Sequence, residues 1–590
     1  MQKQYPSFIV GKFEGEYLKY SGQDFMMVAA GTRSGKGVSV VIPNLLTYPD
    51  SAVVEDIKLE NFLYTSGYRK KCGQEVYLWA PFLESGLTHA FNPFDYIAKR
   101  PAHFRIGDVM SIGEQLYPSN VDPKLKYWND NARNLFIGIV LYLLETPSLT
   151  CSFGEVLRQG SGKGKPIREH LTAIITLRGP AKAQTGAQPA AKLTANPDAS
   201  LRPLSFECLD ALNRFLSQSK EAFSNIVSTM NAPLNVFTNP VVDAATSRSD
   251  FDLADVRKKR MTIYVGLNPN KLKEGALLAN LFFSQLIDLN TTELPQENPA
   301  LKYQCALVMD EFAAIGKLDI VDTANPFIAG YNLRLMLIFH GMSQLSDPKL
   351  YGQHGAETLA INSKMRVLFA PRTLKDSEEY SKMLGQFTHL ARSKGRSRGK
   401  SSTTSENTSE HGRPLLLPQE LRALSSRKQI ITIEGCDPIL CDKAFFYEDP
   451  ELVDRLVQQS VYLQGVMAGH AKKNARRARW GMAPKLPTQV EFEHAAFVER
   501  ELAAPVPRID VEKWWRDQTN ARRRQTAAGE APRDVRAHEV DVLKPSDFAN
   551  HSEICASLFK LMPFLSGVIL SNANPAAPAA RATNVEGVPA

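Results

Sequence analysis

The sequence predicts an α/β fold: a parallel sheet interrupted by an all-helical insertion and followed by a mostly helical C-terminal extension. Short apolar segments typical of buried strands alternate with helical patterns at the start of the chain and again from residue 251. Between about residues 103 and 250 strand patterns are scarce, and beyond residue 450 basic helical segments appear. We therefore expect a core in two parts, 1–102 and 251–450, an inserted all-α domain, 103–250, and an extension, 451–590.

The composition bounds the class of protein. The chain has 590 residues, 43% of them hydrophobic and 22% charged, which is typical of a globular protein with several domains. The net charge of +8 is mild for this length and compatible with an anionic partner. Seven scattered Cys residues, without a compact framework, predict reduced thiols in a cytosol. No run of about 18 apolar residues and no signal peptide is present, so we expect a soluble chain.

The first strand pattern, 25–28, leads through a turn of small residues into a segment, 38–42, that can open a helix. Such a turn points backbone N–H groups at one place, at the positive end of the helix dipole, which suits phosphate oxygens. Lys36 adds a charge that can reach the terminal phosphates of a nucleotide. Two positions depart from the usual P-loop: Ala30 replaces a Gly, and Gly37 replaces the hydroxyl residue that binds magnesium. An ordinary Gly-rich turn is the alternative.

A second element favours nucleotide hydrolysis over that alternative. The apolar strand pattern 306–309 ends in two carboxylates, Asp310 and Glu311. In P-loop enzymes an Asp at such a strand end holds magnesium. The adjacent Glu is placed to polarise the attacking water. A surface pair of acids is common by itself, but together with the Lys36 turn it predicts a site that hydrolyses a nucleotide.

Two further strand ends carry polar residues. Asp56, Lys58 and Glu60 follow a second buried strand, and they either line a ligand site at the carboxyl edge of the sheet or form a solvated turn. Gln344 follows the strand pattern after Asp310, where it can touch a γ-phosphate and report hydrolysis. A helix-capping or buried polar role is the alternative for Gln344.

The remaining elements follow from periodicity and from helix-breaking residues. Pro43 should kink the helix after the Lys36 turn or end it near Ile42. The strands that we expect are 51–54, 75–79, 261–265, 333–339, 365–370, 429–434 and 443–446, after a β-rich start over 1–24. The expected helices are 137–144, 221–230, 275–289, 320–331 and 377–385.

Several segments read as polar loops or charged surfaces. A Pro/Ala/Gln-rich stretch near 178–200 predicts a flexible loop. Residues 391–413 predict a basic, solvated loop, with sequence-independent contact to nucleic acid phosphates as the alternative. The basic runs 471–479 and 522–524 and the amphipathic segment 554–570 are either solvated faces or surfaces for anionic lipid, DNA or a protein partner.

In combination, these motifs resemble the type IV secretion coupling proteins, the TraG-like ATPases of conjugation. A Gly after the P-loop Lys is usual in that family, so Gly37 is no objection to a P-loop. The resemblance covers about residues 25–450, and its motifs are 31–38 with 42–46, 56–61, 310–312 with 315–318, 343–345, and 413–416 with Pro418.

The resemblance implies a RecA-like P-loop NTPase core that uses ATP and Mg²⁺. Asp310 is the implied metal ligand, and the implied catalytic residues are Glu311, Lys36, Gln344 and Arg334. Arg334 is our candidate for an arginine finger from a neighbouring subunit, a group worth ~10³–10⁵ in rate, with Arg372 as the second candidate. The implied nucleotide-binding residues are Gly31, Thr32, Arg33, Ser34, Gly35, Lys36, Gly37 and Val38.

The resemblance also implies partners and a location. Such proteins form homohexameric rings on the cytoplasmic face of the bacterial inner membrane and deliver relaxase–DNA complexes or protein effectors to a type IV secretion channel, with non-specific DNA contacts. Family members usually begin with transmembrane helices that this sequence lacks. We expect that an anchor was removed or that this member attaches through partners, and the soluble chain could be monomeric. The region beyond 450 is expected to recruit substrates or adaptors.

Two other functions stay open at this point. One is a receptor or scaffold of the secretion machine that binds substrates without hydrolysing ATP. The other is a cytosolic ring-shaped DNA translocase with the same core. The sequence does not decide between DNA and protein as cargo.

Overall fold

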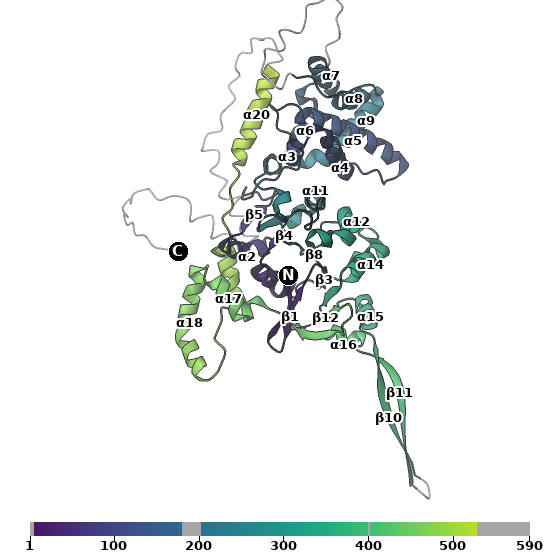
Figure 1. Cartoon of the computed structure of the whole chain (residues 1–590), viewed down its shortest axis with the longest axis vertical. Helices are drawn as coiled ribbons and strands as arrows, with labels where there is room; N and C mark the ends of the chain where they lie inside the picture. Colours follow the sequence, from purple (N-terminus) through teal and green to yellow (C-terminus); the bar gives the residue numbers. More distant parts are fainter. Residues whose placement is uncertain (1–4, 180–201, 399–401, 528–590) are drawn as a thin grey trace, which may run out of the picture.

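An eleven-stranded sheet forms the centre of the computed structural model, which describes residues 5–179, 202–398 and 402–527 (Figure 1). The strand order is β2-β1-β13-β12-β9-β3-β8-β7-β4-β6-β5. The bounds are β1 (Ser7–Phe13), β2 (Glu16–Ser21), β3 (Met26–Ala29), β4 (Ser51–Asp56), β5 (Glu75–Trp79), β6 (Met261–Gly266), β7 (Cys305–Met309), β8 (Leu333–Phe339), β9 (Met365–Leu368), β12 (Lys428–Ile433) and β13 (Ile439–Asp442).

The seven strands from β9 to β5 in this order are parallel, and the other four continue the sheet in antiparallel fashion. Parallel strands place all their carboxyl ends at one edge, so the residues that follow β3, β8, β7 and β4 come together there. Ala29 pairs with Phe339, and Glu55 pairs with Met309. This register puts the ends of the four central strands at the same level.

Both faces of the central strands are buried, which explains why their sequences are almost continuously apolar. Alternate residues of β3 belong to different cores. Met26 and Val28 pack on the side of α1 (Ile42–Thr47) and α2 (Glu60–Lys71), and Met27 packs on the side of α11 (Leu272–Asn290). The other core helices are α12 (Asp319–Ile328), α13 (Met342–Leu345), α14 (Gly352–Asn362), α15 (Leu374–Met383) and α16 (Pro418–Arg422).

The helix after the P-loop begins with a π-helical turn. Gly37–Val41 forms this turn, and the Ile42 N–H bonds to the carbonyl of Gly37. The wider turn accommodates Pro43, which has no N–H and stands in the first turn of α1. A helix end near Ile42, one of the two predicted outcomes, is therefore wrong, because α1 continues to Thr47.

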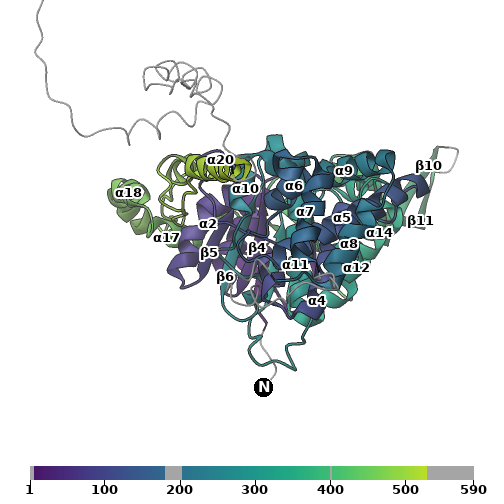
Figure 2. The ribbon, with the colours of Figure 1, turned by 90° about the horizontal axis from the view of Figure 1, so that it is seen from above.

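The described residues between β5 and β6 build a helical region that lies over one end of the sheet (Figures 1 and 2). Its core is continuous with that of the α11 face and contains Phe94, Phe136 and Phe153. The helices are α3 (Asp95–Lys99), α4 (Ala102–Leu116), α5 (Pro123–Leu144), α6 (Phe153–Gly160), α7 (Ile167–Arg178), α8 (Phe206–Leu216), α9 (Lys220–Leu234) and α10 (Pro240–Ala245).

A two-stranded ribbon projects from the body of the protein (Figure 1). β10 (Gln386–Arg398) pairs with β11 (Ser402–Pro414) in antiparallel register. The solvated loop predicted over 391–413 is therefore wrong. The backbone groups pair across the ribbon although its side chains are largely exposed; Leu390, for example, is 53% exposed.

The C-terminal extension packs back onto both parts of the molecule. Its described part, which ends at residue 527, contains α17 (Pro450–Val457), α18 (Val461–Arg479), α19 (Gln489–Glu493) and α20 (Val511–Ala527). Leu452, Leu456 and Phe492 share a buried cluster with Ile42 and Leu46 of α1. The extension is therefore fixed to the helix that follows the P-loop.

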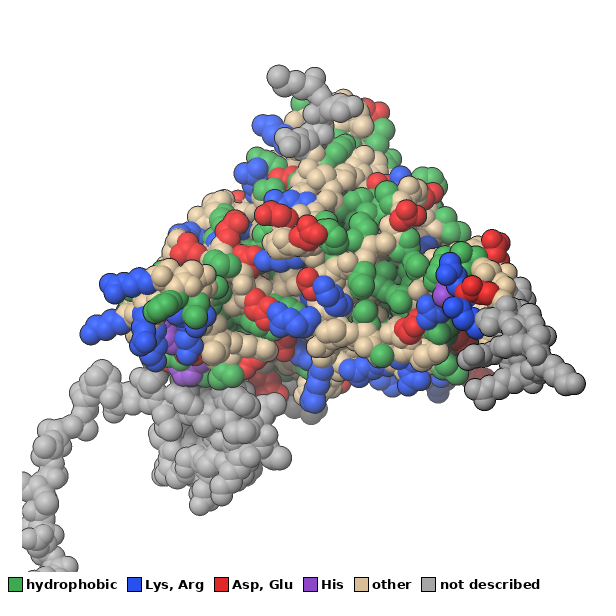
Figure 3. Space-filling model, turned by 90° about the horizontal axis from the view of Figure 1, so that it is seen from below, with side chains coloured by type: hydrophobic (Ala, Val, Ile, Leu, Met, Phe, Trp, Pro, Cys, Tyr) green, Lys and Arg blue, Asp and Glu red, His purple; other side chains and the backbone are tan. Residues whose placement is uncertain are grey.

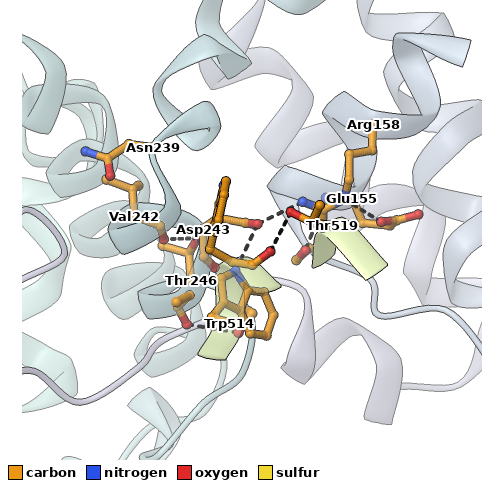
Figure 4. Close-up of polar contacts among 12 residues, drawn as sticks. Glu155, Arg158, Asn239, Val242, Asp243, Thr246, Trp514 and Thr519 are labelled. Atoms are coloured by element: carbon orange, nitrogen blue, oxygen red, sulfur yellow. Dashed lines mark hydrogen bonds and ion pairs between the residues drawn. The ribbon is translucent and has the colours of Figure 1, made fainter. Parts of the chain in front are cut away.

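The same extension then runs along the body to the helical region, where α20 lies over α10 (Figure 2). The Ile509 N–H donates to the carbonyl of Gly86 over 2.8 Å. Figure 4 shows Asp243 between Arg158 and Trp514. Its Oδ2 accepts hydrogen bonds from the Arg158 guanidinium at 2.8 Å and from the Trp514 indole N–H at 3.1 Å. The extension therefore joins the core to the helical region.

The structure contradicts one more expected strand and does not describe two of the expected segments. A strand at 443–446 is wrong, because β13 ends at Asp442 and Phe446–Glu448 is a 3-10 turn. The loop predicted over 178–200 lies outside the described residues except for its first two, and the segment 554–570 lies wholly outside them. In the described ranges, no helix combines the length and apolar character needed to cross a membrane.

Candidate nucleotide-binding site

The loop after β3 has the backbone of a phosphate-binding turn. It begins where the Ala30 N–H donates to the Phe339 carbonyl at 2.8 Å, and it turns where the Ser34 N–H donates to the Gly31 carbonyl at 3.2 Å. Arg33 and Gly35 have positive φ angles of 57° and 88°. Gly is required at position 35 both by this φ and because a Cβ there would lie 3.2 Å from the ring of Phe445.

The structure brings Lys36 and the twin acids together. The Lys36 Nζ lies 2.5 Å from Glu311 Oε1 and 3.8 Å from Asp310 Oδ1, and it donates to the Asp310 backbone carbonyl at 2.9 Å. The two segments are 274 residues apart in the chain. One cationic group and two carboxylates therefore face one another at the carboxyl edge of the sheet.

Asp310 fits the requirements of a metal ligand. One of its oxygens, Oδ2, accepts a hydrogen bond from the Asn61 amide at 3.1 Å, while Oδ1 is buried without a hydrogen-bond partner in the described structure. Burial raises the pKa of Asp310, and the Lys36 charge opposes this effect. A buried carboxylate oxygen that lacks a donor is suited to a hard cation such as Mg²⁺.

Glu55 is a further acid that the sequence analysis did not single out. It is fully buried, and neither oxygen makes a hydrogen bond of normal geometry, although the backbone amide of Glu311 partly stabilises its charge. Burial, reinforced by the charge of Asp310, raises the pKa of Glu55 to about 8. Glu55 is thus expected to be largely protonated at neutral pH, a state in which it can donate a hydrogen bond.

Asp56, Lys58 and Glu60 have different surroundings. Asp56 is buried, burial raises its pKa to about 8, and its Oδ2 accepts the N–H of Phe62 at 2.7 Å at the start of α2. Lys58 and Glu60 are exposed. Of the three residues, Asp56 has a structural role in positioning α2, and it is Asn61 from the same segment that contacts Asp310.

Gln344 lies at the same edge of the sheet and is linked to the P-loop through His340. Gln344 Oε1 accepts the backbone N–H of His340 at 2.9 Å. The His340 ring lies with Nδ1 3.4 Å from the carbonyl of Ala30 and Nε2 3.7 Å from Glu311 Oε2. The sequence analysis missed His340, although its position directly after β8 was a usable signal.

Two more cations contact the P-loop backbone. The Lys443 Nζ donates to the Ser34 carbonyl at 2.9 Å and stands 3.5 Å from the centre of the Phe369 ring. Burial lowers the pKa of Lys443 to about 8. Arg372 lies over Gly31 and donates to the carbonyl of Thr32. Arg372 therefore contacts the loop of its own chain, and its expected role as a finger on a neighbouring subunit stays a prediction.

Arg334 is also not a finger residue. It stands near the amino end of β8, opposite to the edge that carries Lys36, and its side chain is 0% exposed. Its guanidinium donates to the carbonyls of Pro6, Tyr20 and Asp24 at 3.0–3.1 Å, and it lies 3.9 Å from the centre of the Phe8 ring. These contacts fix β1 and β2 to the core and leave no group free to reach another subunit.

Comparison with known proteins agrees with this arrangement. A family model described as type IV secretory system conjugative DNA transfer matches residues 1–468. Protein VirD4 of Rhizobium rhizogenes is 30% identical over 436 residues, which are 74% of this chain and 60% of that protein. Conjugal transfer protein TraG of Escherichia coli is 24% identical over 499 residues, 77% of this chain and 74% of that protein. The chain thus spans about three fifths of the length of VirD4.

Among solved structures, the bacterial conjugative coupling protein TrwBdeltaN70, in a trigonal form in complex with sulphate, has a similar fold. The TM-score is 0.50 with 15% sequence identity, and the match covers 71% of this chain and 85% of that one. At this identity the likeness concerns the fold alone, and it confirms the predicted α/β class with a P-loop core.

Proposed function

We propose that this chain, which belongs to the family of type IV secretory system proteins for conjugative DNA transfer, is a coupling ATPase. It would recruit DNA–relaxase complexes or protein substrates and deliver them to a secretion channel. The observation that carries the proposal is the convergence of Lys36 with Asp310 and Glu311 at the carboxyl edge of the sheet. Nucleotide hydrolysis requires this combination of a phosphate-binding cation, a metal ligand and a general base.

The contacts of Lys36 suggest how binding prepares the site. Its ammonium group is held by Glu311 at 2.5 Å. A bound triphosphate would draw Lys36 toward its terminal phosphates and release Glu311, whose carboxylate could then orient and polarise the attacking water. Residues 31–38 would donate their N–H groups to the phosphates. Asp310, through its Oδ1, which accepts no hydrogen bond, would hold Mg²⁺, which neutralises phosphate charge when it is bound.

Gln344 is proposed to link the state of the nucleotide to the rest of the fold. Its hydrogen bond to His340 connects α13 to a ring that lies beside both Ala30 and Glu311. A change in the position of Glu311 would therefore alter the contacts of His340 and, through its backbone N–H, those of Gln344. In a homohexameric ring, which we propose as the active form on the cytoplasmic face of the inner membrane, such a link would couple hydrolysis to movement.

The test compares ATP binding and turnover in the parent chain and in two variants. Lys36→Ala should bind ATP weakly, and Glu311→Gln should bind ATP but turn it over at least ~100-fold more slowly, the size of a general-base contribution. Lys124→Ala, an exposed lysine of α5, is the control for loss of a positive charge. Turnover is measured with and without DNA.

The outcomes separate the competing functions. Unchanged turnover in both site variants would overturn the proposal. Binding without hydrolysis, even at high protein concentration, would favour a substrate receptor or scaffold. Directional movement along duplex DNA without any secretion partner would favour a cytosolic translocase.

A further inference from the structure

The second half of α18 and the segment that follows it form a strongly basic projection, which we call the basic arm, residues 470–485. No Asp or Glu occurs anywhere between residues 455 and 490. In Figure 3 basic side chains gather at the left-hand corner, where α18 lies in Figure 1. The basic residues of the arm are Lys472, Lys473, Arg476, Arg477, Arg479 and Lys485.

These cations are exposed and form no ion pair with any carboxylate that the structure describes. All six are exposed, and across the described ranges no carboxylate lies within 4 Å of any of their charged groups. Elsewhere cations are commonly paired; Lys317, for example, lies 2.8 Å from Asp322. Six like charges held together on one helix and its return segment repel one another, so the arm is suited to an anionic partner that supplies the missing countercharge.

The arrangement of the arm favours a polyanion over a lipid surface. At 3.6 residues per turn, the five cations of the helix span an arc of about 160°. The other side carries Ala471, Ala475 and Ala478, which are exposed. The return segment lies beside the helix: Asn474 and Lys485 exchange two hydrogen bonds, at 2.6 and 3.1 Å, and the Arg477 Nε donates to the Ala483 carbonyl at 2.7 Å. A helix that lies in a membrane interface needs a face of large apolar side chains, which these positions do not provide.

An exposed aromatic residue stands at the end of the same helix. Trp480 is 73% exposed and directly follows Arg479. Proteins that bind single-stranded nucleic acids combine a cationic track for the backbone with aromatic rings on which bases stack. Trp480 beside the cations of the arm provides this combination.

We propose that the basic arm is a contact surface for single-stranded DNA, with its cations on the phosphates and Trp480 stacked on a base. The choice of DNA rests on the proposed function, whereas the surface itself is given by the charges and by Trp480. The whole of the arm lies beyond residue 468, where the family match ends. The base of α18 is anchored by Leu463 in the cluster that holds Ile42 and Leu46, so the arm and the helix after the P-loop share a support.

The test measures binding of a labelled 20-nucleotide oligothymidine by fluorescence anisotropy, without nucleotide, between 50 and 200 mM salt. The arm variant carries Lys472→Gln, Lys473→Gln, Arg476→Gln and Arg477→Gln. Each lost phosphate contact on a single strand lowers the slope of log K against log salt by ~0.7, so we expect the slope to fall by up to ~3. Trp480→Ala should weaken single-strand binding by ~5- to 100-fold, with little effect on a duplex of equal length.

The controls distinguish a specific surface from net charge. A matched variant that neutralises four exposed lysines of the body, at 124, 165, 220 and 302, should keep the parental slope. The arm variant should keep its basal ATP turnover, because none of its four substituted residues lies in the nucleotide site. If hydrolysis proves independent of Lys36 but the arm variant still loses DNA binding, only the proposed function fails.

Two results would overturn the inference about the arm. One is an unchanged salt slope in the arm variant together with an unchanged affinity in Trp480→Ala. The other is an unchanged affinity for DNA combined with lost binding to phosphatidylglycerol vesicles, which would assign the arm to an anionic membrane instead.

Discussion

Replacement of Arg334 by Met separates a structural role from a catalytic one. The guanidinium makes three hydrogen bonds to backbone carbonyls and stacks on Phe8. Hydrogen bonds from a charged donor contribute ~1.5–3 kcal/mol each, and a desolvated cation–π contact contributes ~2 kcal/mol. Burial lowers the pKa of Arg334 to about 10, which corresponds to a desolvation cost of ~3 kcal/mol. This cost is absent when the uncharged Met replaces Arg334. Together these contributions predict a net loss of ~3.5–8 kcal/mol in the free energy of unfolding.

The sign of the pKa shift shows that the charge of Arg334 is itself a cost. A cation with a pKa lowered by folding is stabilised more in the unfolded chain, so its charge opposes folding at every pH below about 10. The loss expected for Arg334→Met therefore comes from the three buried carbonyls left without a donor and from the lost contact with Phe8, not from the charge. Arg334→Lys keeps the charge but cannot form the same three hydrogen bonds. Its free energy of unfolding should therefore lie between those of the parent and of Arg334→Met.

The assay combines stability with turnover. The first thermal transition should shift to lower temperature, and amide hydrogen exchange should accelerate in β1 and β2, which Arg334 holds. At a temperature where the variant remains folded, ATP turnover should stay within a few-fold of the parent. A loss of ~10³-fold or more in turnover with unchanged exchange in β1 and β2 would refute our reasoning and restore Arg334 as a finger.

Three other predictions follow from contacts around the site and the extension. Affinity for ATP should fall between pH 7 and 9, because Lys443, whose pKa is lowered to about 8, loses its charge beside the P-loop in this range. Lys443→Met should remove most of this pH dependence, as measured by titration with a fluorescent nucleotide. Asp243→Asn should weaken the docking of α20, since Trp514 and Arg158 share its carboxylate, and limited proteolysis should then release α20 faster than in the parent. Asn44→Ala should lower the free energy of unfolding by ~2–4 kcal/mol, measured by urea denaturation, because Asn44 makes three buried hydrogen bonds, two of them to Ile9.

The convergence of the site was predictable from the sequence for a simple physical reason. Lys36 and Asp310 each follow a short apolar strand pattern, and parallel strands bring their carboxyl ends to one edge. The same rule should have excluded Arg334, which stands at the start of its strand rather than after it. Gln344 and His340, which follow the end of β8, obey the rule.

Other features were not predictable because their signals are long-range or absent from local patterns. Among the described side chains of the β10–β11 ribbon none is buried, and its sequence lacks the alternation of apolar and polar residues that identifies a strand. Lys443 and Ser34, which share a hydrogen bond, are 409 residues apart in the sequence, and no local pattern predicts such a contact. The expected strand 51–54 stopped short of Glu55, which is the fifth residue of the fully buried strand β4.

The packing of α17 and α19 on α1 has a practical consequence for anyone who shortens this protein. A chain that ends at residue 450 would expose Ile42 and Leu46, on the apolar side of the helix that follows the P-loop, and Tyr64 of α2. Such a fragment would be prone to aggregate, and α1, the helix that follows the P-loop, would lose the packing that supports it. Low activity in a trimmed chain would then report a damaged scaffold, not a missing partner-binding tail.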